Sequence, residues 1–172
     1  MRATCTAPYS GSAHKKGQAV NIPPAAPGAF PSASQSCLNQ DTSVISEARK
    51  GHKANPGVLA FWSAVEATDI YIAVQSIGEI RRGLENIRQR GDDDQTRRLE
   101  SWLDLIVISY GDRILSFDVD CTQVWGKLMS PHPQHPIDKQ IAAIALIHDL
   151  IVATRNVDDF NGLGVEINNP FS

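Results

Sequence analysis

Hydrophobic residues recur with a helical period in some segments of the chain and form short β-branched runs in others. The helical period predicts helices over residues 43–50, 56–65, 76–90, 94–109, 118–130 and 137–149. The short runs predict strands over residues 69–74, 113–117, 151–154 and 163–167. Strands that alternate with helices indicate βαβ units. We therefore expect an α/β fold of three α/β/α layers, with a mostly parallel central sheet covered on both faces.

The first 36 residues follow neither period. They hold five of the ten prolines, eight alanines and five serines. A segment of this composition has too few large apolar side chains to build a core. We therefore predict a disordered N-terminal extension over residues 1–36 and one domain over residues 37–172, a length that fits a single domain.

The charge of the chain limits how it can meet a nucleic acid. The net charge is −3, but residues 41–172 carry 13 basic and 19 acidic residues, a net charge of −6. An acidic body does not bind nucleic acid by bulk electrostatics. A protein of this charge that acts on nucleic acid needs a local device to offset the repulsion, such as carboxylates that hold a divalent metal ion.

Other features of the composition exclude several classes of protein. The three cysteines are scattered and form no CxxC pair, which excludes a disulfide scaffold and a structural zinc module and favours the reducing cytoplasm. The longest apolar run, Ile141–Ile147, is seven residues long, whereas a membrane span needs about 20. We expect a cytoplasmic protein with no membrane partner.

Four acidic residues fall where a parallel sheet places its ligands, beyond the carboxyl ends of the strands. Asp41 lies where a first strand should end, Glu79 follows the strand over residues 69–74, and Asp159 follows the strand over residues 151–154. Asp138 opens the apolar helix over residues 137–149. Four carboxylates that meet at one edge repel one another unless they hold a hard cation such as Mg²⁺ or Mn²⁺.

Each acid also has a simpler explanation. Asp41 can cap the helix that follows it, and Glu79 can complete a capping box that begins at Ser76. Asp138 lies in a first helical turn, where the helix dipole favours a negative charge, and Asp159 can be a turn residue.

Two histidines lie in the proline-rich loop over residues 131–136. His132 and His135 are close enough in sequence to form a metal-binding pair, but a solvated loop is the simpler interpretation.

Seven short segments now identify a family by their order along residues 41–172. They are Asp41-Thr-Ser-Val-Ile-Ser-Glu47, Ala54-Asn-Pro-Gly-Val-Leu59, Gly78-Glu-Ile-Arg-Arg-Gly83, Gly111-Asp-Arg-Ile-Leu115, Trp125-Gly-Lys-Leu-Met129, Ile137-Asp-Lys-Gln-Ile-Ala-Ala143, and Thr154-Arg-Asn156 with Asp159-Phe160. The chain closes on Gly162-Leu-Gly-Val165 and Asn169-Pro170. In this arrangement the chain resembles the PIN-domain toxins of the VapC type, in their FitB-like branch.

The resemblance implies a function. It implies an Mg²⁺- or Mn²⁺-dependent RNA endonuclease that is the toxin of a type II toxin–antitoxin pair, forms a homodimer and is inhibited by a VapB-like antitoxin. In such an enzyme a metal-activated water attacks a phosphodiester. The family's acidic positions match Asp41, Glu79, Asp138 and Asp159, which would hold the ion and carry catalysis. Thr154 lines the family's site, and we expect Thr154 and Arg155 to contact the RNA substrate.

The chain departs from the family pattern just before Asp41. Its residues there, Gln35-Ser-Cys-Leu-Asn-Gln40, are poor material for a central strand, and Ser43 takes the place of the family's asparagine. A weak first strand would misplace Asp41, and a ligand misplaced by about 1 Å can cost on the order of 100-fold in rate. The alternative function is therefore a decayed, catalytically inactive toxin that only binds antitoxin or dimerises.

Overall fold

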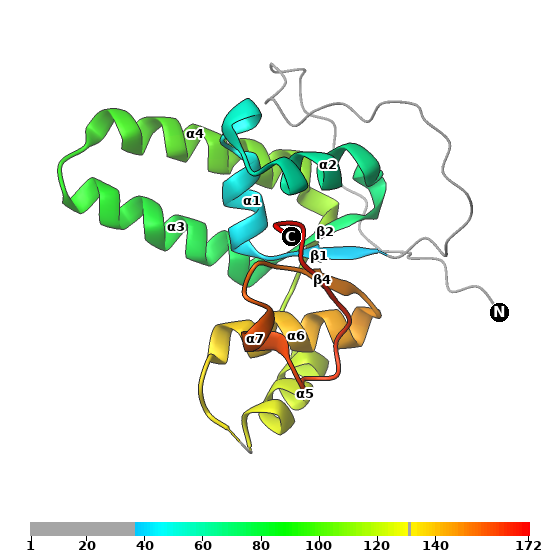
Figure 1. The fold of residues 1–172 in the computed structure, drawn as a ribbon. Helices are drawn as coiled ribbons and strands as arrows, with labels where there is room; N and C mark the ends of the chain where they lie inside the picture. The colour runs from blue at the N-terminus through cyan, green and yellow to red at the C-terminus, as the bar shows by residue number, and fades with distance from the viewer. Residues whose placement is uncertain (1–36, 131) are drawn as a thin grey trace.

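The structure is a computed structural model that describes residues 37–130 and 132–172 (Figure 1). The predicted N-terminal extension, residues 1–36, lies outside the described residues. None of the helices in the described part is both long and apolar enough to cross a membrane.

Five strands form a single sheet in which every neighbouring pair is parallel. The strands are β1 (Leu38–Gln40), β2 (Ile70–Ala73), β3 (Ile114–Leu115), β4 (Ile151–Ala153) and β5 (Ile167–Asn168), in the spatial order β3-β2-β1-β4-β5. The predicted α/β fold is confirmed, and the sheet is parallel throughout. Strand β1 is central, so its carboxyl end lies between those of β2 and β4.

Helices cover both faces of the sheet, in three layers (Figure 1). One face packs against α1 (Thr42–Ala48), α2 (Pro56–Ala64), α3 (Val74–Gln89) and α4 (Asp93–Ser109), and the other against α5 (Val119–Met129), α6 (Pro136–His148) and α7 (Val157–Phe160). Short 3₁₀ helices occupy Gly51–Lys53, Ala67–Asp69 and Gly111–Arg113. Helices α3 and α4 pair as a hairpin that extends to the left of the sheet in Figure 1.

Side-chain caps explain where several helices begin. The Asn55 side chain accepts hydrogen bonds from the backbone N–H groups at the start of α2, where Pro56 is the first helical residue. Asp92 and Asp118 cap α4 and α5 in the same way, each accepting a backbone N–H three residues on, at 3.0 and 2.9 Å. The local sequence therefore explains where these three helices begin.

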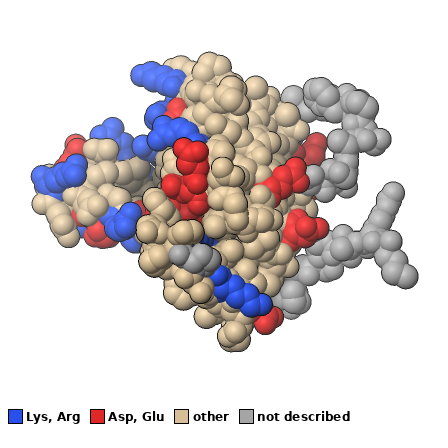
Figure 2. Space-filling view, turned by 60° about the horizontal axis from the view of Figure 1, so that its bottom comes forward, with Lys and Arg blue, Asp and Glu red and all other residues tan. Residues whose placement is uncertain are grey.

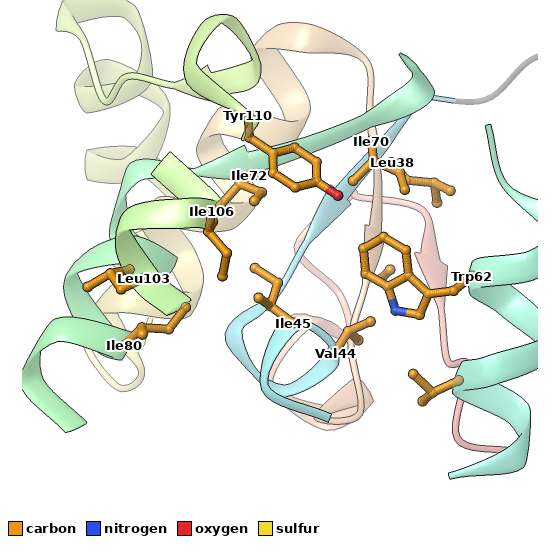
Figure 3. Packing of buried hydrophobic residues seen from close by; sticks show 12 residues of the cluster. Leu38, Val44, Ile45, Trp62, Ile70, Ile72, Ile80, Leu103, Ile106 and Tyr110 are labelled. Atoms are coloured by element: carbon orange, nitrogen blue, oxygen red, sulfur yellow. The ribbon is translucent and has the colours of Figure 1, made fainter. Parts of the chain in front are cut away.

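Two hydrophobic clusters lie on opposite faces of the sheet. Figure 3 shows the first, in which Ile45 of α1, Ile72 of β2 and Ile106 of α4 point toward one another beside Tyr110. Burial raises the pKa of the Tyr110 phenol. The second cluster joins Cys121 of α5 and the apolar side of α6 to the other face of the sheet.

The first strand forms despite its polar sequence. Strand β1 pairs with β2 on one side and β4 on the other, and all three of its residues are buried. Asn39 donates a hydrogen bond of 3.4 Å to the Ile141 carbonyl of α6. The Gln40 side chain is fully buried, and neither its amide oxygen nor its amide nitrogen has a partner among the described residues. Backbone pairing on both sides therefore outweighs the unfavourable side chains.

Two predictions for the C-terminal third are corrected. The predicted strand over residues 163–167 is wrong except at its last residue, because Gly162 and Gly164 adopt left-handed backbones with φ of +78° and +83° that interrupt an extended run. The helix predicted over residues 137–149 is apolar nearly all round, which predicts a buried helix, but only residues 139 and 141–145 are buried. Its last turn exposes Leu146 and Ile147.

Replacing Gln40 with leucine is expected to stabilise the protein. Leucine is of similar size and removes two buried polar atoms that lack partners, which should raise the free energy of unfolding by about 1–3 kcal/mol in chemical denaturation. Asn39→Leu on the opposite face is the matched control, and it should gain less because it also breaks the bond to Ile141. A loss of stability in Gln40→Leu would show that the carboxamide has a partner in solution.

Candidate active site

The four acidic residues predicted from the sequence meet at the carboxyl edge of the sheet. Asp41 follows β1, Glu79 lies in the second turn of α3, Asp159 lies in α7 after β4, and Asp138 is in the first turn of α6. The charges of the other three all act on Asp138, which places the four within one electrostatic site. Figure 2 shows the molecule with the bottom of Figure 1 turned forward. Acidic side chains gather near the centre of this view, and the basic residues of the α3–α4 hairpin lie at the left.

Asp41 is the most constrained of the four. Its side chain is 4% exposed. One carboxylate oxygen accepts a hydrogen bond from the Thr42 backbone N–H at 2.7 Å, and the other accepts the hydroxyls of Ser43 at 2.9 Å and Thr154 at 2.7 Å. Its backbone N–H donates to the Ala153 carbonyl of β4. Asp41 does cap α1, as the simpler explanation held, but it also faces the site.

Glu79 is linked to Asp41 through Thr42, the first residue of α1. The Thr42 hydroxyl donates a 2.7 Å hydrogen bond to Glu79. The capping-box explanation of Glu79 is wrong: α3 begins at Val74, so Ser76 lies inside the helix and donates instead to the Gln40 carbonyl. On the outer side, Arg82 approaches Glu79 at 3.8 Å with a side chain that is 74% exposed.

The other half of the site contains one of the two histidines that the sequence offered as a possible metal-binding pair. His135, the residue before α6, places its Nδ1 3.6 Å from an Asp138 oxygen and 3.4 Å from an Asp159 oxygen. One ligand atom from each of the three lies within 4.8 Å of the others. The loop position and the 55% exposure of its side chain agree with the solvated-loop interpretation, but His135 also lies beside two of the acids.

The protonation of Asp138 reports how closely the acids are gathered. Burial is the largest cause of its shift, and the charges of Asp41, Asp159 and Glu79 add to it, so that its pKa rises from 3.8 to about 6. The side chain of His135 acts in the opposite direction. A site that resists a fourth negative charge in this way is suited to a divalent cation, and its oxygen-rich donor set fits hard ions.

Thr154 and Arg155 differ in their surroundings. Thr154 is fully buried, and its hydroxyl both donates to Asp41 and accepts the Asn156 backbone N–H at 3.0 Å. This geometry supports orientation of Asp41, and contact of Thr154 with RNA stays a prediction. The guanidinium of Arg155 lies 5.4 Å from the centroid of the Phe171 ring, while its backbone N–H donates to Ser43.

Sequence reasoning missed Ser43 as part of the site and placed His135 in a metal-binding pair with His132 without linking it to the acids. In the sequence Ser43 is only a departure from a family asparagine, yet its hydroxyl donates a hydrogen bond to Asp41. His135 carried a faint signal, since it lies three residues before Asp138 across a proline that opens a helix.

Comparison with known proteins supports one family. The PIN domain family matches residues 40–164. The plasmid stability protein StbB of Pseudomonas syringae pv. tomato is 31% identical over 137 residues, covering 76% of this chain and 96% of its own length. The VapC ribonuclease Y4jK of Sinorhizobium fredii is also 31% identical, over 138 residues, covering 76% of this chain and 95% of its own length.

Solved structures show the same fold. The crystal structure of FitAcB from Neisseria gonorrhoeae superposes with a TM-score of 0.69 at 27% identity, covering 78% of this chain and 98% of that one. A VapBC structure from Salmonella typhimurium shares 16% identity at a TM-score of 0.63, covering 77% of this chain and 97% of that one.

The raised pKa of Asp138 predicts how the metal-free protein responds to pH. Because the folded state binds this proton more tightly than the unfolded chain, the contribution of Asp138 is favourable at low pH and is lost as the pH rises through about 6. Asp138→Asn should therefore raise the free energy of unfolding in EDTA by about 1–3 kcal/mol at pH 7.5. This gain should shrink as the pH falls toward about 4. Urea titrations across this range measure it.

The exposed neighbour Asp158 provides the control for this measurement. Asp158→Asn changes the same charge in α7 outside the cluster, and it should leave the pH dependence as in the wild type. If Asp138→Asn raises the free energy of unfolding by the same amount at every pH, the raised pKa of Asp138 is contradicted.

Removing the Thr154 hydroxyl is expected to weaken metal binding. Thr154→Val keeps the shape of the side chain but removes one of the two hydroxyl hydrogen bonds to the same Asp41 oxygen, and loss of such an orienting bond should lower Mn²⁺ affinity about 10-fold in calorimetry. Thr154→Ser retains the hydroxyl and should bind nearly as wild type. Equal affinity in the valine and serine variants would show that the hydroxyl does not orient Asp41.

Proposed function

The chain belongs to the PIN-domain family, and from this we propose that it is a metal-dependent RNA endonuclease, the toxin of a type II toxin–antitoxin pair. The observation that carries the proposal is the convergence of Asp41, Glu79, Asp138 and Asp159 at the carboxyl edge of the sheet. A cluster of carboxylates that raises the pKa of one of its own members is unfavourable by itself. Such a cluster is suited to holding a cation.

The residues present fit Mg²⁺ or Mn²⁺. Asp41, Glu79, Asp138 and Asp159 offer carboxylate oxygens, the ligands these ions prefer. When bound at such a site, a divalent ion lowers the pKa of a water molecule and neutralises charge on a phosphodiester.

The chain's own groups prepare this site in advance. The hydroxyls of Ser43 and Thr154 fix one oxygen of Asp41, and the Thr42 hydroxyl fixes Glu79 relative to it. Since these bonds join β1, α1, α3 and the loop after β4, the carboxylates are oriented without the ion. That arrangement reduces the reorganisation that binding and reaction would otherwise require.

The site also needs positive charge to receive a phosphodiester. Arg82 beside Glu79 is the best-placed candidate, because its side chain is 74% exposed and its one ion pair is long, at 3.8 Å. Arg81 is more engaged, with an ion pair of 3.0 Å to Glu100 of α4. Arg155 lies over Phe171 and would have to leave that ring to meet RNA.

The partners follow from the relatives. A structure of FitAcB from Neisseria gonorrhoeae is 27% identical, a structure of FitAB bound to a DNA fragment is 26% identical, and a relative at 31% identity is named a VapC ribonuclease. A VapB-like antitoxin and an RNA substrate are therefore the partners we propose. A homodimer remains a prediction from the resemblance.

The alternative of a decayed toxin rested on the polar first strand. In the structure β1 is paired on both sides and Asp41 is held by three side-chain hydrogen bonds, which supports the enzyme. Gln40 makes the strand less stable without displacing the ligand that follows it.

Cleavage of total RNA by purified protein with Mn²⁺ tests the proposal. Asp138→Asn or EDTA should lower the rate by about 100-fold or more, because several kcal/mol of charge stabilisation are lost. Asp158→Asn, an exposed neighbour of Asp159, should cleave as wild type. Absence of cleavage by folded, antitoxin-free protein, together with no toxicity on expression, would overturn the enzyme and favour a binding module.

A further inference from the structure

We propose that His135 is a nitrogen ligand of the metal centre and gives it a preference for transition-metal ions over Mg²⁺. This inference rests on the metal dependence of the proposed function. It adds one residue to the four carboxylates and changes the chemistry of the donor set. The preference would be for Mn²⁺, Co²⁺ or Zn²⁺, which accept an imidazole ligand.

The distances around His135 fit the edges of a coordination shell. Its Nδ1 lies 3.4 Å from an Asp159 oxygen and 3.6 Å from an Asp138 oxygen. Metal–ligand bonds of about 2.1 Å place neighbouring ligand atoms roughly 3.0–3.4 Å apart. The imidazole therefore needs only a small shift to share an ion with either carboxylate, and one ligand atom from each of the three groups lies within 4.8 Å of the others.

The backbone directs the imidazole to this position. His135 has a left-handed conformation, with φ of 53° and ψ of 54°, directly before Pro136 at the start of α6. A residue before proline is turned away from the right-handed helical region. The backbone of His135 lies outside that region, and in this conformation its imidazole lies beside Asp138 of α6 and Asp159 of α7.

A second basic group nearby is directed elsewhere. Lys139, the residue after Asp138, is 5% exposed, and its ammonium donates to the carbonyl of His132. It holds the loop rather than neutralising the acids. His135 is thus the basic side chain that the described loop directs at both Asp138 and Asp159.

The type of donor atom determines which ions bind more tightly. Mg²⁺ prefers oxygen ligands and keeps several of its waters, whereas an imidazole suits transition-metal ions such as Ni²⁺ and Zn²⁺. The affinity of a site with a nitrogen donor rises from Mn²⁺ through Co²⁺ and Ni²⁺ to Cu²⁺ and falls again at Zn²⁺. One nitrogen among four carboxylates would therefore raise the affinity for these ions while leaving Mg²⁺ nearly unchanged.

Calorimetric titration of the full chain with CoCl₂, MnCl₂ and MgCl₂ tests the proposal. His135→Asn keeps a residue that tolerates the left-handed backbone, and His135→Gly removes the side chain without strain. Both variants should bind Co²⁺ at least about tenfold more weakly and Mg²⁺ within about threefold of wild type. His132→Gln is the matched control, because Lys139 contacts its carbonyl and not its ring, and it should bind all three ions as wild type.

Pulsed electron paramagnetic resonance of bound Mn²⁺ gives a readout independent of affinity. A coupling to a directly bound nitrogen is expected in the wild type and in His132→Gln, and it should vanish in both His135 variants. Unchanged Co²⁺ affinity, an equal loss for Co²⁺ and Mg²⁺, or no binding of either ion by the wild type would overturn the proposal. A gain in Co²⁺ affinity would do so too, since it would mean that the imidazolium competes with the ion for the carboxylates.

These titrations contain no RNA, so their failure is separate from that of the proposed nuclease. Protein that binds Co²⁺ through His135 but cleaves nothing would support the ligand and overturn the enzyme. An active nuclease whose Co²⁺ affinity is the same with and without the His135 side chain would support the enzyme and overturn the ligand.

Discussion

The repulsion among four carboxylates at one edge of a parallel sheet is the constraint on which the rest of this structure depends. Parallel connectivity brings the ends of β1, β2 and β4 together, and with them Asp41, Glu79 and Asp159. Helix α6 adds Asp138, whose pKa is raised to about 6, first by burial and then by the charges of the other three acids. The hydrogen bonds to Asp41 and Glu79 hold two of these carboxylates in place at that edge.

The fold could be predicted from the sequence because its strands and helices differ in period. The convergence of the acids could also be predicted, since the carboxyl ends of parallel strands meet at one edge. Strand β1 was harder to predict: Asn39 and Gln40 argue against it locally, and its pairing with β2 and β4 is a tertiary effect. The four-residue helix α7 is too short to show a period.

The positions of Ser43 and His135 could not be predicted from the local sequence pattern, for a different reason. The role of Ser43 depends on the distance between two hydroxyls and one carboxylate, and residues 43 and 154 are far apart in the chain. The placement of His135 depends on a left-handed backbone in a proline-rich loop. Spacing of residue types gives neither the path of such a loop nor the direction of its side chains.

Strand β1 contains a residue that lowers the stability of the domain and is followed directly by a residue of the site. Gln40 places unpartnered polar atoms in the first hydrophobic cluster, and one residue later Asp41 places a buried carboxylate at the site. The buried amide of Gln40 has no hydrogen-bond partner among the described residues, whereas three hydrogen bonds stabilise the buried carboxylate of Asp41. Those bonds come from α1 and from the loop after β4, so the geometry of Asp41 is set by its neighbours more than by the residues of β1. A polar first strand is therefore compatible with an ordered metal ligand, and the penalty appears in the stability of the domain instead of the position of the carboxylate.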